Sequence, residues 1–288
     1  MNLRELKKFS IFALVPLAAF VFVLLLPFFN GLINTFTDWD GFKITKFVGL
    51  DNYVQAFQDE KFWTTLNFTF AFVIVSVILV NLIGLLLALL VTVKMKGSSV
   101  LRTFFFVPNL IGGVILGVIW QFIFDRALTN MAELNGWNIF QESWLIEPTT
   151  AFWALIIVTT WQSAGYVMII YVTGIMSIEQ DVIEAARIDG ASPLRTLFSI
   201  KLPLMAQAFT ISLFLTLRNA FMAYDVNLAL TNGGPYRSTE LISMHVYTEA
   251  FDFGQFGTGQ AKAVIMFLIV ALAAITQVAI SKRFEVQR

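Results

Sequence analysis

Five long stretches of this chain contain no charged residue, and each could cross about 30 Å of hydrocarbon as a helix. Hydrophobic residues make up 58% of the sequence and charged residues only 13%, whereas soluble domains carry about 25% charged residues. The chain is therefore predicted to be an all-α, polytopic membrane protein. The uncharged stretches are residues 9–37, 62–93, 103–124, 148–178 and 263–281.

A sixth, shorter apolar run begins at Leu202, is interrupted by Arg218 and resumes as far as Tyr224. Six transmembrane helices in one transmembrane domain, residues 1–288, are therefore expected. An even number of spans leaves both termini on one side of the membrane. The predicted spans are about 9–35, 66–93, 103–124, 151–175, 204–224 and 263–281.

The distribution of basic residues predicts the orientation. Most of the 19 Lys and Arg residues lie before the first span, near residues 94–102, in residues 187–201, or after the last span. Cytoplasmic loops carry the excess of Lys and Arg, so these segments and both termini are expected in the cytoplasm. The first apolar run is longer than the apolar core of a signal peptide, so cleavage is not expected.

A charged segment, EAARIDGASPLRTLFSIKLP, separates two apolar runs at residues 184–203. Ser177 and Gln180 have the spacing of a capping box, which predicts a helix from Ile178 that Gly190 ends. Ser192 followed by proline predicts the start of a second helix, which Pro203 is expected to break. Residues 177–203 are thus predicted to be a cytoplasmic helix-turn-helix.

Two alanines next to Glu184 leave little side-chain bulk on the first of these helices. Such a surface would let another protein approach the backbone closely, as in a docking element. The alternative from the residues alone is an amphipathic loop that lies at the headgroup surface without a partner.

The segment contains Glu184-Ala-Ala, Gly190, Ile200 and Leu202-Pro203 in the pattern EAA-x3-G-x9-I-x-LP. This pattern resembles the signature of binding-protein-dependent ABC importer permeases, and every specified position matches. The resemblance covers nearly the whole chain and favours the carbohydrate-uptake branch of the maltose or raffinose type. Further similar motifs are residues 49–53, 102–108, 188–191 and 231–235; residues 125–130 depart from the usual glycine-containing turn.

The resemblance implies a type I importer permease that takes up sugars, oligosaccharides in particular, by alternating access. It implies neither a metal site nor a nucleic-acid partner. It implies a bacterial plasma-membrane complex with a second, different permease, two ATPase subunits and an extracytoplasmic sugar-binding protein. No G-x4-G-K-[ST] motif occurs in the sequence, so ATP and Mg are expected on the partner ATPase and no cofactor on this chain. The residues expected to couple to the ATPase are Glu184, Ala185, Ala186, Asp189, Gly190, Ala191, Leu202 and Pro203.

Polar residues in the middle of the fourth and fifth spans are candidates for contact with a carbohydrate, since polar side chains are costly in the membrane unless used. Hydrogen bonding between packed helices is the alternative role. Nearby aromatic rings that could stack on sugars are Trp161, Tyr166, Phe221 and Tyr224. The candidate substrate residues are Asn219, Thr216, Ala223, Thr159, Gln162, Ser163, Tyr224 and Arg218.

Arg218 lies within the predicted fifth span and must face protein or water. Asp225 follows seven residues later, on the same face if the helix continues, and is an available partner for an ion pair. The open alternatives for Arg218 are a gate, a substrate contact and a structural ion pair. The scarcity of cationic residues favours a neutral sugar over glycerol phosphate.

Other functional classes find less support in the sequence. There is no cysteine, and the single histidine, His245, is expected to be a polar loop residue and not a metal ligand. A secondary transporter would be expected to show internal repeats and intramembrane carboxylates, and a membrane enzyme a catalytic constellation. The external segments 31–61 and 227–262 are expected to meet the sugar-binding protein.

Overall fold

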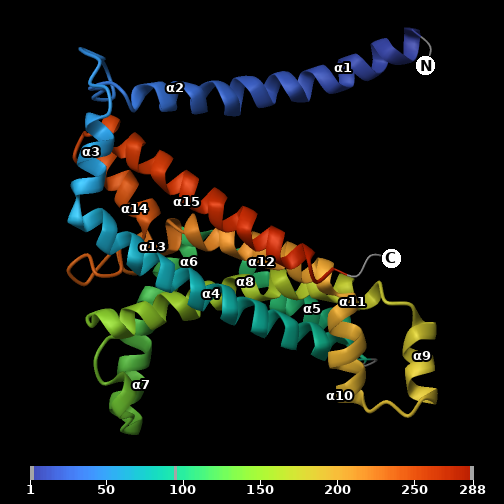
Figure 1. Ribbon diagram of the computed structural model, residues 1–288. Helices are drawn as coiled ribbons and strands as arrows, with labels where there is room; N and C mark the ends of the chain where they lie inside the picture. Colours follow the sequence, from blue (N-terminus) through green and yellow to red (C-terminus); the bar gives the residue numbers. More distant parts are fainter. Residues whose placement is uncertain (1–2, 94–95, 286–288) are drawn as a thin grey trace. The chain divides into compact units, whose positions relative to one another are not determined.

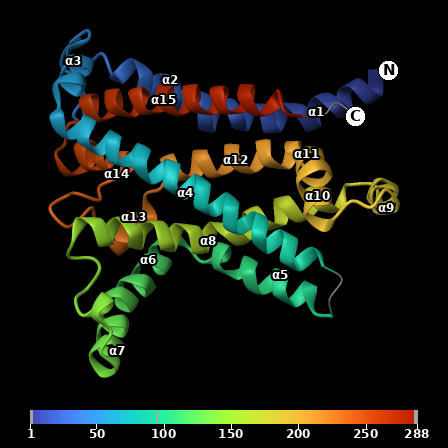
Figure 2. The same ribbon diagram turned by 60° about the horizontal axis from the view of Figure 1, so that its bottom comes forward.

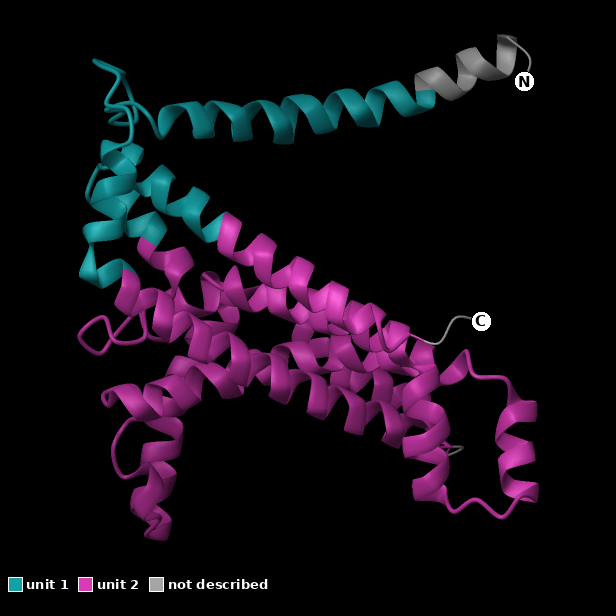
Figure 3. Ribbon diagram, in the orientation of Figure 1, with its two compact units in different colours: residues 1–62, 246–267 teal, residues 63–245, 268–288 magenta. Residues whose placement is uncertain are grey.

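The computed structural model describes residues 3–93 and 96–285, and the regular structure in these ranges is helical apart from one bridge between Thr37 and Phe47. The prediction of an all-α fold is therefore confirmed. The chain divides into two compact units (Figure 3). Unit 1 contains residues 1–62 and 246–267, and unit 2 contains residues 63–245 and 268–288.

Unit 1 begins with a continuous helical run (Figure 1). The amide of Asn52 organises the segment after this run, because its Nδ2 donates to the backbone oxygens of Thr35 and Thr37, each at 2.8 Å. Phe28 contacts Phe267 edge-on, with 5.5 Å between ring centroids. The elements of unit 1 are α1 (Leu3–Phe20), the π-helical turn η1 (Val21–Leu25), α2 (Leu26–Asn34), α3 (Asp51–Gln58), the start of α4 (Glu60–Thr92), η6 (Thr248–Asp252) and the first part of α15 (Phe256–Lys282).

Unit 2 contains the remaining parts of α4 and α15 and the elements between α4 and η6, apart from the last two residues of α14. These are α5 (Ser98–Phe106), η2 (Val107–Leu110), α6 (Gly113–Phe122), η3 (Ile123–Ala127), α7 (Leu128–Asn135), η4 (Asn138–Phe140), α8 (Pro148–Met176), α9 (Gln180–Ile188), α10 (Pro193–Thr196), η5 (Leu197–Lys201), α11 (Leu202–Leu204), α12 (Ala206–Phe221), α13 (Asp225–Leu230) and α14 (Ile242–Tyr247).

The centre of unit 2 is α8, which packs against α5 and α12 (Figure 2). Buried side chains of α8 contribute to two apolar clusters, one containing Leu155 and Val158 and the other containing Val167 and Tyr171. Small residues bring helices together: the Cβ of an alanine at Gly117 would lie 2.5 Å from Ala229 Cβ. Close packing through small residues is typical of helix contacts in membranes.

Residues 103–124, expected as one span, form two helices separated by an extended turn. Ile111 and Gly112 have ψ angles of 126° and 141°, so the backbone leaves the helical region between η2 and α6. Pro108 lacks an N–H donor, and the glycine pair at 112–113 offers little resistance to the turn. The helical run that follows continues to Asn135. It includes residues 125–130, where the sequence lacks the glycine-containing turn that is usual in similar permeases.

The sequence predicted that the helix before the fifth span would break at Pro203, and this prediction is wrong. The helix continues to Leu204, and the bend of 68° falls at Met205, before Ala206–Phe221. In an α-helix the ring of Pro203 would collide with the carbonyl of Ser199. Ser199 lies in the π-helical turn Leu197–Lys201, whose wider spacing accommodates the proline.

Among the described residues, five or six helices are candidates for crossing a membrane. Five are long and apolar enough to cross a membrane, and the bent pair Pro193–Leu204 and Ala206–Phe221 would be the sixth. This matches the polytopic fold expected from the sequence. The five are Phe12–Asn34, Glu60–Thr92, Gly113–Asn135, Pro148–Met176 and Phe256–Lys282.

Candidate functional site

A polar cavity of about 380 Å³ lies within unit 2, between α8, α12 and the turn after α12. All eight residues that the sequence suggested for substrate contact line it. Five of them carry a neutral hydrogen-bonding group on an otherwise apolar helix, so the cavity can donate to and accept from a polyhydroxylated molecule. The eight are Thr159, Gln162, Ser163, Thr216, Arg218, Asn219, Ala223 and Tyr224.

The helix α12 ends at Phe221, so Ala223 lies in a turn and not on the same helical face as Thr216 and Asn219. The backbone of this turn is held by Ser243, whose Oγ donates to the Ala223 oxygen. Even so, Thr216, Asn219 and Ala223 all reach the cavity.

Thr216 and Gln162 of the candidate side chains donate to backbone oxygens of the protein. Thr216 Oγ1 donates to the Ser212 oxygen at 2.8 Å, and Gln162 Nε2 donates to the Ile111 oxygen at 3.0 Å. The interhelical role considered from the sequence therefore applies to Gln162, which joins α8 to the turn before α6. Thr216 and Gln162 have less hydrogen-bonding capacity left for a ligand.

A buried hydrogen-bond network adjoins the cavity at Thr216 and joins α4, α8 and α12. Asn81 Nδ2 donates to Thr216 Oγ1 at 2.9 Å, and Tyr171 Oη donates to Asn81 Oδ1 at 2.7 Å. Ser212 Oγ donates in turn to Tyr171 Oη at 2.7 Å. Sequence reasoning missed this network, although an asparagine within the apolar run of α4 is a signal for one.

Arg218 and Asp225 both line the cavity, but among the residues that the structure describes their charged groups do not lie within 4 Å of each other as an ion pair. The chain turns at Tyr224, where φ is −131° and ψ is −58°, and Asp225 starts the separate helix α13. Arg218 Nη1 instead donates to Asn219 Oδ1 at 3.4 Å.

The four aromatic candidates divide between different surroundings. Tyr166 and Tyr224 line the polar cavity. Phe221 is buried in the apolar core, edge-on to Phe70 at 5.5 Å. Trp161 lines a separate apolar groove of about 670 Å³ on the other side of α8. Two of the four rings are therefore placed to stack on a ligand. The cavity also includes Ser76, Asn109 and Asp225, which the sequence did not single out as substrate contacts.

The charged segment contains a helix closed by a left-handed glycine, as predicted. Gly190 has φ +75°, and its N–H donates to Arg187 while the Ala191 N–H donates to Ala186. These two bonds make a Schellman motif. The Ser192 hydroxyl accepts from the Arg195 N–H at 3.3 Å, which confirms the predicted cap of α10.

The start of this segment differs from the prediction. The helix α9 begins at Gln180, not at Ile178, and its N-cap Glu179 has no side-chain capping bond. Ser177 ends α8, and its Oγ donates to the Gly174 oxygen at 2.9 Å. This serine therefore contributes to the end of α8.

The exposed face of the segment carries both charge and apolar surface. Glu184, Ala185 and Asp189 are exposed, whereas Ala186 is 7% exposed and faces its own chain. Ile188 and Leu194 are 86% and 68% exposed. Large exposed apolar side chains next to charged ones are typical of a surface that another protein covers.

His245 is a buried residue of α14 and not the loop residue that was expected. It is 2% exposed, and its Nδ1 lies 3.5 Å from Glu240 Oε1. Arg237 contacts the same carboxylate through two bonds of 2.9 and 2.6 Å. Burial alone raises the pKa of Glu240, but the contacts with His245 and Arg237 outweigh it and hold the pKa below its ordinary value.

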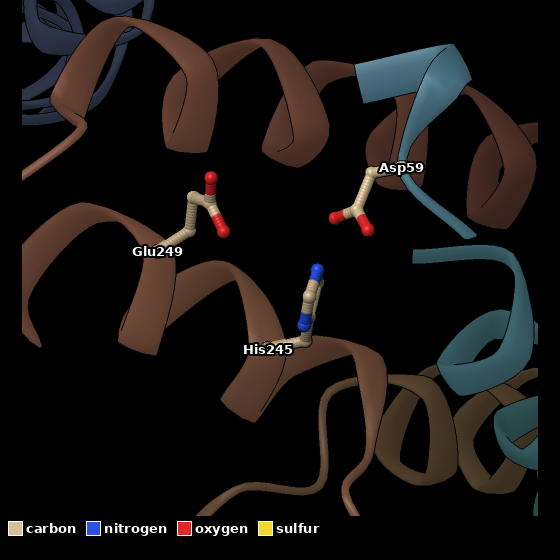
Figure 4. Close-up of side chains that lie close together, drawn as sticks. All are labelled: Asp59, His245 and Glu249. Atoms are coloured by element: carbon tan, nitrogen blue, oxygen red, sulfur yellow. The ribbon is translucent and has the colours of Figure 1, made fainter. Parts of the chain in front are cut away.

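Figure 4 shows the carboxylates of Asp59 and Glu249 in unit 1. Both carboxylates contact a buried lysine. Lys262 Nζ lies 2.6 Å from Asp59 Oδ2 and 2.9 Å from Glu249 Oε2. The lysine is 1% exposed and comes from α15, so it joins this helix to the end of α3 and to η6. A fixed ammonium between two carboxylates already supplies the positive charge that a metal ion would bring.

A helical protein with five or six candidate spans, a polar cavity between its helices and a charged helical hairpin has the features of a membrane transport component. The family model described as "Binding-protein-dependent transport system inner membrane component" matches residues 80–286. The chain is 43% identical over 279 residues to the probable starch degradation products transport system permease protein AmyD of Thermoanaerobacterium thermosulfurigenes, covering 96% of this chain and 94% of that protein.

Two further comparisons agree. The multiple sugar-binding transport system permease protein MsmF of Streptococcus mutans is 32% identical, with 96% of this chain and 95% of that protein covered. A bacterial alginate ABC transporter, crystallised with an alginate pentasaccharide-bound periplasmic protein, contains a chain of the same fold, with a TM-score of 0.82, 21% identity and 98% coverage of both chains.

The chain belongs to the family of binding-protein-dependent transport system inner membrane components. It is a permease subunit of an ABC transporter, and it resembles transport components without an ATPase site of their own.

Proposed function

We propose that this permease carries oligosaccharides into the cell, through the polar cavity of unit 2, by alternating access. The cavity is the observation that carries the proposal: Asn219, Ser163 and Thr159 offer hydrogen bonds, and Tyr166 and Tyr224 offer rings for the apolar faces of sugars. The starch degradation products named for the 43% identical relative favour glucose oligomers as the substrate class. Glycerol phosphate is disfavoured because Asp225 offsets the charge of Arg218 at the cavity wall.

The segment 177–203 would couple this movement to ATP hydrolysis on a partner. Its exposed Ile188, Leu194 and Phe198 provide apolar surface for a cleft in an ATPase subunit, next to the exposed Glu184. In the proposed complex two such subunits bind ATP and Mg, and a second permease completes the pathway. To shift the populations of two conformational states from 1:99 to 99:1, a partner must favour one state by about 5.5 kcal/mol. The contact between this segment and the ATPase must therefore be tight.

The remaining partners follow from the predicted orientation. Both termini and the segment 177–203 would lie in the cytoplasm of a bacterial cell. The opposite face would receive sugar from a binding protein, and in this region Tyr236 is 95% exposed after the turn that includes residues 231–235. A periplasmic protein is present in the complex of the related alginate transporter.

The substrate proposal predicts a specific effect of Asn219→Ala. Removing one amide that bonds a sugar should lower the maximum uptake rate about tenfold, the effect of losing about one hydrogen bond. The measurement is uptake of maltose, maltotriose, raffinose and glycerol 3-phosphate into proteoliposomes with the complex purified from native membranes and its binding protein. Gln207→Ala removes an exposed amide from the same helix, outside the cavity, and should have little effect. Uptake of none of the three sugars by the unaltered complex would contradict the proposed function.

The coupling proposal predicts that Gly190→Val uncouples the ATPase. A Cβ at Gly190 meets no atom within 4 Å, so valine acts only through the backbone, which must leave φ +75° or remain strained. Sugar-stimulated ATPase activity should fall severalfold while the amount of inserted protein is unchanged.

Gly136→Val is the matched control for this variant. Gly136 also ends a helix at a positive φ, +69°, with no atom within 4 Å of a Cβ, but it closes α7 and not α9. Its substitution imposes a similar backbone strain and should preserve ATPase stimulation. Equal activity of the two variants at equal protein levels would remove the coupling role of the segment.

A further inference from the structure

Ser76 of α4 places a buried, unpaired hydroxyl at the wall of the polar cavity. The residue is 1% exposed, and its Oγ has no hydrogen-bond partner among the described residues. It lines the cavity together with Val80, one helical turn further along α4. Since nearly all buried hydroxyls are paired, this one is available to a partner from outside the chain, in the space that the cavity provides.

Several other hydroxyls on the helices of unit 2 bond to their own helix. Thr69, Thr92 and Thr216 each donate to the carbonyl four residues earlier, at 2.8 Å. Such a bond is the usual solution for a hydroxyl in an apolar helix. Ser76 does not make it, although the carbonyl of Phe72 lies one turn before it on α4.

We infer that Ser76 is a further specificity-determining residue, whose hydroxyl bonds to a hydroxyl of the sugar in the cavity. A rotation about one bond is enough to turn a serine hydroxyl among its three staggered positions, so no movement of α4 is needed to aim it. This assigns α4 as a third polar wall of the site, facing a ligand held by Ser163 of α8 and Asn219 of α12. The inference rests on the proposed function of the cavity.

Two other unpaired hydroxyls provide matched controls. Thr65 Oγ1 on α4 and Thr160 Oγ1 on α8 are also buried without a partner, in residues 2% and 6% exposed. Neither lines the polar cavity; Thr160 faces the apolar groove. If orphaned hydroxyls only weaken packing, then Ser76→Ala, Thr65→Val and Thr160→Val should behave alike.

The experiment measures maltotriose uptake and thermal unfolding of the reconstituted complex with each variant. Ser76→Ala is expected to lower the maximum uptake rate about five- to tenfold, without lowering the unfolding temperature, because it removes an unpaired group. The sugar concentration for half-maximal uptake should stay unchanged, since the soluble binding protein sets it. Thr65→Val and Thr160→Val should leave both quantities near those of the unaltered complex.

A series of monodeoxy maltotriose analogues identifies the bond itself. The analogue that lacks the hydroxyl bonded to Ser76 should be carried at the same reduced rate by the unaltered complex and by Ser76→Ala. Full uptake by Ser76→Ala, in a complex whose unaltered form carries maltotriose, overturns the inference and leaves the proposed function intact. If the unaltered complex carries no sugar, the proposed function fails first. Equal losses of uptake in all three variants would assign the effect to packing.

Discussion

Replacing Gly165 by serine is expected to prevent unit 2 from folding. A Cβ at Gly165 would lie 1.8 Å from the Phe105 carbonyl oxygen and 2.6 Å from its carbonyl carbon. Both atoms belong to the backbone of α5, so no side chain can rotate away, and the two helices would have to separate. Helices in a membrane are held largely by such close packing, and overpacking a core costs about 1–3 kcal/mol or more. The purified yield of monodisperse complex should fall to background.

Gly112→Ser is the control for this loss. Gly112 has an extended backbone that any residue adopts, a Cβ there meets nothing within 4 Å, and serine is a favoured residue at its N-cap position. The same serine should therefore leave the yield near that of the unaltered protein. A Gly165→Ser complex with normal yield and normal unfolding temperature would show that α5 and α8 do not pack as closely as the structure has them.

The long helices could be predicted from the sequence because one property, an uncharged apolar run, determines each of them. The helices α4 and α8 correspond to runs of this kind. The runs do not reveal where a helix bends, since a break depends on local backbone geometry. Pro203 is accommodated by a π-helical turn, while Met205, which has no helix-breaking chemistry, occupies the bend.

The candidate cavity could be predicted in part for a similar reason. Polar residues in the middle of an apolar helix, such as Asn219 and Ser163, stand out without knowledge of the fold. The role of Thr216 could not be predicted, because its partner Asn81 comes from a distant helix that only the tertiary structure brings beside it. Ser76 was missed because a single serine in a membrane helix normally bonds to its own backbone. Only the geometry shows that it does not.

Lys262→Met is expected to give the second large loss of stability, in unit 1. The ammonium contacts two carboxylates, and Glu249 is itself 8% exposed. Methionine fills a similar volume but leaves both carboxylates without this cation, and breaking a buried ion pair on one side costs about 3–5 kcal/mol. The unfolding temperature of the purified complex should fall clearly. Lys43→Met provides the control, because Lys43 is an exposed lysine of the same unit, and it should change the unfolding temperature little.

A second substitution separates the loss of charge pairing from the loss of packing. In the Lys262→Met background, Glu249→Gln removes one of the two carboxylates left without the lysine and should recover part of the lost stability. In the unaltered background, Glu249→Gln should instead destabilise, because the lysine loses one of the two carboxylates that it contacts. An effect of Glu249→Gln on stability that changes sign between the two backgrounds indicates that Glu249 and Lys262 are energetically coupled. If Glu249→Gln has the same effect in both backgrounds, Lys262 acts through its volume and not through its charge.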